Sequence, residues 1–272
     1  MKKEILSVDI IENQNIAENV WRMRFKYNTG STAQKEKIEA VAGQFVNLYL
    51  NRKDLLLPRP ISICRAEDET LTLVYAVVGK GTEELASYRA GTSLRASTPL
   101  GNGFPIKDEW DDNSDVKKDV TALVIGGGLG VPPLLELAYG LSAHGIKVDA
   151  ALGFREKPFL INEFEKAGVL VHIATESGQS GFRGRVTDLM LEKKLTADRY
   201  FACGPKPMLK AVTSICKERN QEIAVSLEER MGCGYGACLS CTCRIKGADS
   251  LSNRRVCKDG PVFWGSEVDW DA

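Results

Sequence analysis

The cysteines near the end of the chain have a spacing suited to metal chemistry. Cys233, Cys238 and Cys241 follow one another as Cys-x4-Cys-x2-Cys, and Cys257 comes after fifteen further residues. Three thiolates from one loop and a fourth from a returning segment are typical of a [2Fe–2S] site. Three glycines lie at the start of the loop, around Cys233: Gly232, Gly234 and Gly236. Their freedom to adopt positive φ lets such a loop turn backbone N–H groups toward the sulfur atoms.

Other interpretations of these cysteines are open. A structural zinc site also uses four thiolates, but it is usually built from two short knuckles such as Cys-x2-Cys. Disulfides need an oxidising compartment, and the N-terminal segment shows no apolar stretch of a secretion signal. Cys243 lies two residues after Cys241, on the same face of an extended chain, and is the candidate for an alternate ligand. We expect the metal ligands to be Cys233, Cys238, Cys241 and Cys257.

Length and charge narrow the function classes. A chain of 272 residues predicts about two domains with room for a small appendage. Lys+Arg and Asp+Glu both number 36, so no basic surplus indicates nucleic acid, and no apolar stretch approaches a membrane span. We therefore expect a cytoplasmic protein whose eight cysteines serve metal or redox chemistry.

Two kinds of sequence periodicity divide the chain. Short segments of alternating apolar and polar residues predict an antiparallel barrel of six strands within residues 4–27, 44–50, 60–64, 71–78 and 92–96. An acidic run at 107–119 follows and is interpreted as a linker. Continuous apolar strands separated by helical segments then predict a parallel sheet, with strands at 120–125, 148–152, 170–174, 200–202 and 223–227.

The predicted fold is therefore a multidomain α+β protein. Residues 1–107 form the barrel, residues 108–227 form an α/β nucleotide domain, and residues 228–272 form a small domain around the cysteines. The last of these is rich in Gly and Cys, and it has too little periodic apolar sequence for an independent core.

Two turns of the predicted parallel sheet are candidates for nucleotide binding. Gly128, Gly130 and Pro133 form a Gly-x-Gly-x-x-Pro turn after the first strand, where backbone N–H groups and a helix N-terminus can approach a pyrophosphate. Cys203 and Gly204 end a later strand, and ligands of open α/β sheets lie beyond such strand ends. The alternatives are a tight strand–helix turn without a ligand and a buried structural cysteine.

The barrel carries two candidate anion sites. Prolines on both sides hold Arg59 extended, which aims a permanently charged group at a fixed target such as a phosphate. Gly81 and Thr82 enter a short helix that we expect Thr82 to cap and Gly91 to close. An exposed Arg on an edge strand and plain helix capping are the alternatives. No catalytic triad or paired carboxylates occur, so we predict no catalytic residue on this chain.

The order of these motifs carries a family resemblance. Arg59-Pro60-Ile61-Ser62, the glycine-rich turn at 126–133 and the cysteine loop with its tail Asp259-Gly260-Pro261-Val262-Phe263 follow one another. The chain thereby resembles the ferredoxin-reductase-like flavoproteins. Within that group it more closely resembles the electron-transfer subunits of NAD-dependent dihydroorotate dehydrogenases of class 1B, and the resemblance extends over nearly the whole chain.

The resemblance implies three cofactors: FAD, a [2Fe–2S] cluster and NAD. Many relatives carry Arg where this chain has Ala76, so the contact that this Arg makes with an FAD phosphate is missing here. The nearby Lys80 is the candidate to replace it. Preference for NAD over NADP is likewise an expectation of the resemblance. The FAD contacts that it implies are Arg59, Pro60, Ile61, Ser62, Val74, Tyr75, Ala76, Gly81 and Thr82.

The resemblance also implies a partner. A separate FMN-containing catalytic subunit oxidises dihydroorotate in pyrimidine biosynthesis, and electrons cross the [2Fe–2S] cluster and FAD to NAD+, with two copies of each subunit. The apolar residues expected at the partner interface are Tyr235, Leu239, Phe263 and Trp264. Alternative functions are a reductase subunit of the sulfhydrogenase or ferredoxin:NADP oxidoreductase type, or a redox-sensing or zinc-stabilised binding module without turnover.

Overall fold

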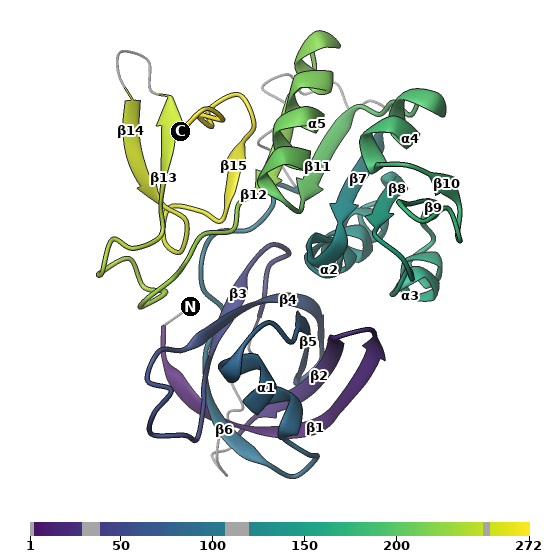
Figure 1. The fold of residues 1–272 in the computed structure, drawn as a ribbon. Helices are drawn as coiled ribbons and strands as arrows, with labels where there is room; N and C mark the ends of the chain where they lie inside the picture. The colour runs from purple at the N-terminus through teal and green to yellow at the C-terminus, as the bar shows by residue number, and fades with distance from the viewer. Residues whose placement is uncertain (1–2, 29–38, 107–119, 247–250) are drawn as a thin grey trace.

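The computed structural model describes residues 3–28, 39–106, 120–246 and 251–272. The acidic run predicted as a linker, 107–119, lies outside the described residues. Figure 1 shows a closed barrel, a second sheet flanked by helices and a two-stranded hairpin, which confirms the predicted α+β architecture. Among the described residues, no helix has the length and apolar character required to cross a bilayer.

The barrel is antiparallel and its strands run in the order β1-β2-β5-β4-β3-β6. Side chains alternate across each strand, so Val46 and Leu48 fill the barrel while Phe45 and Asn47 point outward. The strands are β1 (Ile5–Ala17), β2 (Val20–Tyr27), β3 (Phe45–Tyr49), β4 (Arg59–Glu67), β5 (Thr70–Ala76) and β6 (Ser93–Ser97). The prediction of six barrel strands is confirmed.

One helix, α1 (Lys80–Ser87), lies between β5 and β6 at the barrel (Figure 1). It begins earlier than predicted, with Gly79 rather than Thr82 at the N-cap position. The Thr82 hydroxyl instead accepts hydrogen bonds from the Val78 N–H (2.8 Å) and the Gly79 N–H (3.2 Å). Thr82 thus stabilises the helix start from within the first turn. The prediction that Thr82 is the N-cap residue was wrong, because the N-cap lies three residues earlier.

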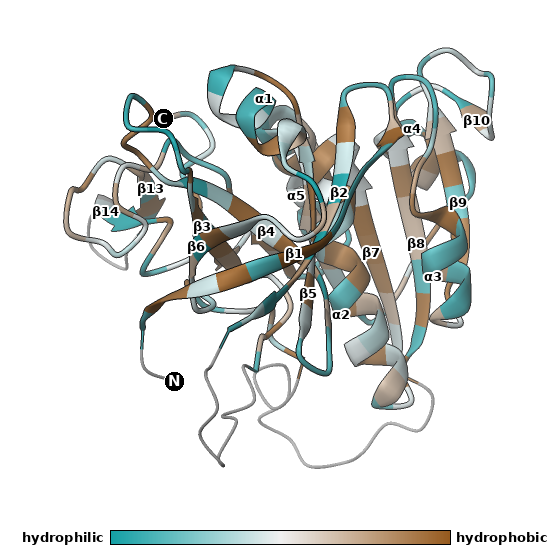
Figure 2. Ribbon diagram, turned by 90° about the horizontal axis from the view of Figure 1, so that it is seen from below, coloured by the Kyte–Doolittle hydropathy of each residue, from teal (hydrophilic) through white to brown (hydrophobic). Residues whose placement is uncertain are grey.

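The second sheet has seven strands in the order β10-β9-β8-β7-β11-β12-β15, and all neighbours are parallel except β15. On β7, Ala122 and Val124 pack against α2 and α3, while Leu123 and Ile125 pack against α4 and α5. Burial of both faces explains why this strand is continuously apolar, as its brown colour in Figure 2 shows. The strands are β7 (Thr121–Gly127), β8 (Lys147–Phe154), β9 (Leu170–Thr175), β10 (Phe182–Arg183), β11 (Arg199–Cys203), β12 (Ile223–Ser226) and β15 (Val262–Trp264).

The helices of this sheet follow the predicted alternation with its strands. A 3-10 turn at Gly128–Gly130 leads from β7 directly into α2. His144 caps the end of α2 and His172 lies in β9, where its ring nitrogen is 3.2 Å from Asp149, so both histidines have structural roles. The helices are α2 (Val131–Ala143), α3 (Ile161–Lys166), α4 (Val186–Glu192) and α5 (Lys206–Glu218).

The C-terminal segment does not pack as a separate unit. Its hairpin consists of β13 (Thr242–Lys246) and β14 (Leu251–Arg255), and β15 then joins the edge of the large sheet beside β12. Buried residues of this segment, including Val256, belong to the same core as α5. The small domain predicted at 228–272 therefore completes the neighbouring sheet and shares its core; the residue boundaries of the three domains stay predictions.

An ion pair joins the barrel to the parallel-sheet unit. The Glu136 carboxylate on α2 accepts hydrogen bonds from Arg65 Nη1 and from the Ala66 N–H, both at 2.8 Å. The Arg65 guanidinium also lies 3.9 Å from the ring centroid of Tyr139. Glu67 contacts the same guanidinium from the solvent side at 3.6 Å.

This geometry predicts unequal effects of two glutamate substitutions. Glu136→Ala leaves the Ala66 N–H without its acceptor and removes the shortest hydrogen bond of the partly buried Arg65 guanidinium, so we expect a loss of about 1–3 kcal/mol in the free energy of unfolding. Glu67→Ala, the matched control on the same arginine, removes an exposed pair worth below about 1 kcal/mol. Urea unfolding of both variants measures the difference, and an equal or larger effect of Glu67→Ala would contradict the role given to Glu136.

Candidate functional site

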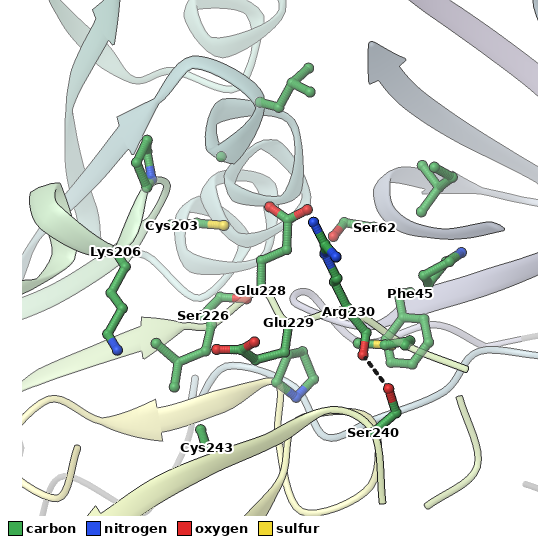
Figure 3. A pocket seen from close by; sticks show the side chains of 18 of the residues that line it. Phe45, Ser62, Cys203, Lys206, Ser226, Glu228, Glu229, Arg230, Ser240 and Cys243 are labelled. Carbon is green, nitrogen blue, oxygen red and sulfur yellow. Dashed lines mark hydrogen bonds between the residues drawn. The ribbon is translucent and has the colours of Figure 1, made fainter. Parts of the chain in front are cut away.

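A cavity of about 1770 Å³ opens where the barrel, the parallel sheet and the C-terminal segment meet. Figure 3 shows side chains from all three parts directed into it. Most of the residues predicted to bind FAD or NAD line this cavity: Arg59, Pro60, Ile61, Ser62, Val74, Tyr75, Ala76, Thr82, Gly130, Cys203 and Gly204. The fold thus brings together motifs that are far apart in sequence.

Arg59 lies against the start of α1. It begins β4 between two prolines, and its Nη1 donates to the Leu57 carbonyl. A Cβ atom added at Gly81 would lie 1.9 Å from Arg59 Nε, so only glycine lets the guanidinium cross the first turn of the helix. A permanent positive charge and a helix N-terminus here face the same cavity, an arrangement suited to a phosphate.

All four residues of the Arg59–Ser62 motif border the cavity. Ser62 points into it (Figure 3), whereas Ile61 also packs against the barrel core. On the neighbouring β5, the Tyr75 ring is buried in the barrel and its hydroxyl donates to Asn13 Oδ1 at 3.0 Å. Tyr75 therefore reaches the cavity through its main chain. Ala76 offers no side-chain donor there, and the exposed Lys80 directly precedes Gly81, over which the Arg59 guanidinium lies.

Strand register brings the ends of three parallel strands into one row. Cys203 at the end of β11 pairs with Gly126 of β7 on one side and with Ser226 of β12 on the other. Burial raises the pKa of the Cys203 thiol to about 12, although a hydrogen bond with Ser226 lowers it. The thiol is therefore protonated at neutral pH, and it offers a small neutral surface rather than a nucleophile.

The glycine-rich turn is shaped by close packing. A Cβ atom added at Gly130 would lie 2.1 Å from the Cys203 carbonyl oxygen, so the two predicted nucleotide turns touch. Gly128 has a φ of 54° with open space around it, and Pro133 is buried in α2. Neither Gly128 nor Pro133 lines the cavity, so direct cofactor contact stays a prediction for both.

Gly130→Ala tests whether this close approach is required. The φ of −78° is open to any residue, so only lack of space opposes a methyl group. We expect a loss of about 1–3 kcal/mol in unfolding free energy, as for other overpacked sites. Gly79→Ala is the control, because nothing lies within 4 Å of its added Cβ. Thermal unfolding compares them, and similar values for both variants would contradict the packing argument.

Several residues that line the cavity were not predicted from the sequence. Glu228, Glu229 and Arg230 come just after the end of β12 and line the cavity (Figure 3). Burial is the main cause of the raised pKa of the Cys203 thiol, and the nearby Glu228 carboxylate raises that pKa further. The Arg230 carbonyl accepts a hydrogen bond from Ser240 Oγ at 3.1 Å, which links this segment to the cysteine loop. The signal that could have found them is their place just beyond the carboxyl end of a predicted strand.

The cysteine loop directs backbone N–H groups at its own sulfur atoms. Cys233 Sγ accepts from the N–H groups of Tyr235 and Ala237, both at 3.3 Å. Gly234 and Gly236 have φ values of 75° and 82°, so the loop needs glycine at both places. A cradle of N–H donors around thiolate sulfur is the outer-shell arrangement of an iron–sulfur cluster.

The four predicted ligands fall into two pairs. The Cys233 N–H donates to Cys238 Sγ, and the Cys257 N–H donates to Cys241 Sγ, both at 3.4 Å. The thiols within each pair also interact with one another. In the described residues, no three His, Cys, Asp or Glu side chains gather as a group for a single metal ion. Two pairs of sulfur atoms match the needs of two irons, so these residues fit a [2Fe–2S] cluster.

Electrostatics differs between the two pairs. Burial raises the pKa of the Cys233 thiol, but backbone hydrogen bonds from Cys238 and Tyr235 lower it by more than that. The resulting pKa is about 6, below the ordinary value of a thiol. Burial, together with the neighbouring Cys241 thiol, raises the pKa of Cys257 to about 12. Cys243 is half-buried, lines the large cavity and packs against the core that holds Cys241 and Cys257. Among the described residues it forms no hydrogen bond with the four sulfur atoms, so it belongs to neither pair.

The exposed edge of the loop is small and apolar. Leu239 is 61% exposed and has a φ of 57°, and its neighbours Ala237 and Cys238 are exposed too. Phe263 is only 8% exposed, because β15 places it in the core of the large sheet. The expectation that Phe263 lies at a partner interface was therefore wrong, while Leu239 remains a candidate.

Comparison with known proteins decides the family. A family model described as the iron-sulfur cluster binding domain of dihydroorotate dehydrogenase B matches residues 228–269. The chain is 43% identical to the dihydroorotate dehydrogenase B (NAD(+)) electron transfer subunit of Geobacillus kaustophilus, over 83% of this chain and 86% of that protein. The chain belongs to this family of electron transfer subunits. The family member from Caldanaerobacter subterraneus is 39% identical over 95% of this chain and 96% of its own length.

Solved structures support the family assignment. The structure of an NADH-dependent reduced ferredoxin-NADP oxidoreductase superposes with a TM-score of 0.80 and 30% identity, covering 97% of this chain and 90% of that chain. A ferredoxin NADP+ reductase from Neisseria gonorrhoeae has a TM-score of 0.63 over 79% of this chain and 91% of its own, but at 16% identity it shows the fold alone. The predicted resemblance to ferredoxin-reductase-like flavoproteins is confirmed.

Proposed function

We propose that this chain passes electrons between a catalytic subunit that oxidises dihydroorotate and NAD+, using a [2Fe–2S] cluster and FAD. The observation that carries the proposal is the shared cavity: the Arg59–Ser62 motif, the ends of the parallel strands and the cysteine loop all border one space. The names of the relatives, electron transfer subunits of dihydroorotate dehydrogenase B (NAD(+)), supply the reaction.

The chain's own residues bind and orient the cofactors. Arg59 and the start of α1 hold the FAD phosphates, and Ser62 with the outer faces of β4 and β5 borders the flavin ring. The turns at Gly130 and Cys203 border NAD. The pair Cys233 and Cys238 and the pair Cys241 and Cys257 would together hold the [2Fe–2S] cluster. When bound, FAD exchanges electrons singly with the cluster and in pairs with NAD.

The partner contacts the exposed edge of the cysteine loop. Cys238 and Leu239 lie at the surface, whereas Cys241 and Cys257 are buried beneath them. The sulfur pair of Cys233 and Cys238 therefore offers electrons a shorter route to another protein than the pair of Cys241 and Cys257. We infer an FMN-containing catalytic subunit as the partner, two copies of each subunit in the complex, and a location in the cytoplasm.

The proposal is tested by co-expression with a dihydroorotate dehydrogenase catalytic subunit under anaerobic conditions. We expect the purified complex to show flavin and [2Fe–2S] absorption and to form orotate and NADH from dihydroorotate and NAD+. Flavin and cluster bands with ferredoxin-dependent rather than dihydroorotate-dependent turnover would identify a ferredoxin-linked reductase, the activity named for one structural relative. Absence of both bands would leave only a zinc-stabilised binding module.

A further inference from the structure

The outer face of β3 is buried although it lies outside the barrel. Val46 and Leu48 fill the barrel interior, so the intervening Asn47 points away from it. Asn47 is nevertheless 0% exposed. The cysteine loop covers it: Asn47 Nδ2 donates to the Cys233 carbonyl at 2.9 Å. A polar barrel residue is thus buried specifically against one of the cluster ligands.

Contacts on both sides of this hydrogen bond are close. A Cβ atom added at Gly234 would lie 2.3 Å from Asn47 Nδ2, so glycine is required for the loop to reach the amide. The Asn47 N–H donates to Ser97 Oγ on β6 at 2.9 Å, and Ser97 is also 0% exposed. Tyr235 of the loop lies beside Ser97 and Tyr49. The loop is therefore seated in a buried polar seam on β3 and β6.

The same strand is paired with the flavin motif. In the β3–β4 register, Asn47 is opposite Pro60 and Phe45 is opposite Ser62. A shift of the Asn47 side chain relative to its strand therefore changes the position of the cysteine loop relative to β4. Backbone hydrogen bonds of the strand pair make this connection stiff.

Stability alone does not account for the asparagine. Its Oδ1 atom is buried and has no hydrogen-bond partner among the described residues. A buried acceptor without a partner lowers stability, whereas an apolar side chain of the same shape avoids that penalty. The N–H bond to the cluster loop is therefore what distinguishes Asn47 from leucine at this position.

We propose that Asn47 is a positioning residue that fixes the Cys233–Tyr235 segment of the cluster loop relative to the flavin strand. The proposal rests on the proposed function, because it concerns electron exchange between the cluster and FAD. In that step one electron leaves one cofactor and enters the other, and no covalent bond forms or breaks. Loss of the Asn47 bond lets the peptide after Cys233 move, and with it the Tyr235 and Ala237 N–H groups that donate to Cys233 Sγ.

Asn47→Leu tests the inference in the full chain carrying FAD and cluster, in complex with the catalytic subunit. After mixing with NADH in an anaerobic stopped-flow instrument, flavin reduction and cluster reduction are followed at separate wavelengths. We expect flavin reduction at the wild-type rate and cluster reduction slowed roughly 10-fold, the size of outer-shell effects at metal sites. The EPR g values of the reduced cluster and its midpoint potential should shift as well.

Asn51→Leu is the matched control. Asn51 Nδ2 also donates to a backbone carbonyl, that of Ser93 at 2.9 Å, but it is exposed and does not touch the cysteine loop. We expect this variant to match the wild type in both rates and in its EPR spectrum. A purely structural role for Asn47 would reduce cluster content yet leave the spectrum of the remaining clusters unchanged, and that result would overturn the inference.

A second variant covers the case in which Asn47→Leu does not fold. Asn47→Ser keeps a small polar group at the seam but is too short to reach the Cys233 carbonyl, so the same slowing and spectral shift are expected. Wild-type cluster reduction and EPR spectra in the folded variants would overturn the role of Asn47 alone. A wild-type protein without flavin or cluster would instead overturn the proposed function.

Discussion

The Cys238→Ser variant is expected to lose its cluster and, with it, all electron exchange with the catalytic subunit. Cys238 is one of two ligands on the exposed side of the loop, and its Sγ accepts the Cys233 N–H at 3.4 Å. A serine hydroxyl replaces a thiolate there and binds iron poorly. The effect on dihydroorotate-dependent NAD+ reduction should exceed the roughly 100-fold loss seen for outer-shell changes at metal sites. Reduction of FAD by NADH should persist, because the flavin motif lies on other strands.

Cys243→Ser is the matched control for this experiment. Cys243 lies in the same segment, but the structure places it on β13 facing the large cavity and outside the two sulfur pairs. Iron content, visible absorption and EPR spectra of both variants measure cluster retention. Cluster loss in Cys243→Ser with retention in Cys238→Ser would exchange the assignments of these two cysteines.

The Arg59→Ala variant is expected to lose most of its FAD on purification. The guanidinium crosses Gly81 at the start of α1 and faces the cavity. A charge-assisted hydrogen bond of this kind contributes about 1.5–3 kcal/mol, which corresponds to roughly 10- to 100-fold weaker FAD binding. Flavin content per chain and titration of the flavin-free protein with FAD measure the change.

Arg89→Ala is the control for general loss of positive charge near α1. Arg89 lies just beyond the helix, is exposed and does not line the cavity, so we expect its FAD content to equal that of the wild type. Arg59→Lys separates charge from shape: a point charge without the planar fork should restore only part of the affinity. Unchanged FAD affinity in Arg59→Ala would reject the phosphate role of Arg59.

Some features of this protein follow from local sequence alone. The Cys-x4-Cys-x2-Cys spacing and its glycines lie within one short loop, so the geometry that they impose is almost independent of the rest of the chain. Alternating apolar and polar residues in the barrel strands indicate burial on one face. The continuous apolar run of β7 indicates burial on both faces. Strand and helix positions could therefore be predicted to within a few residues.

Other features depend on partners that no local pattern indicates. β10 is only two residues long, and β15 gains its place by pairing with β12. Phe263 was expected at a surface because it is apolar and near the cluster, but strand addition buries it in the sheet core. The N-cap of α1 was misplaced because Gly79 can take that position while Thr82 reaches back to it.

The sequence by itself determined which groups this chain offers: four cysteines with cluster spacing, an arginine held between prolines, and glycine-rich turns at strand ends. Tertiary structure alone decided how they meet. Pairing of Cys241 with Cys257, the approach of Gly130 to Cys203 and the bond from Asn47 to Cys233 each join distant segments. Residue types and spacing act through the covalent chain, whereas contacts across 186 residues arise only when separate strands pack on one another.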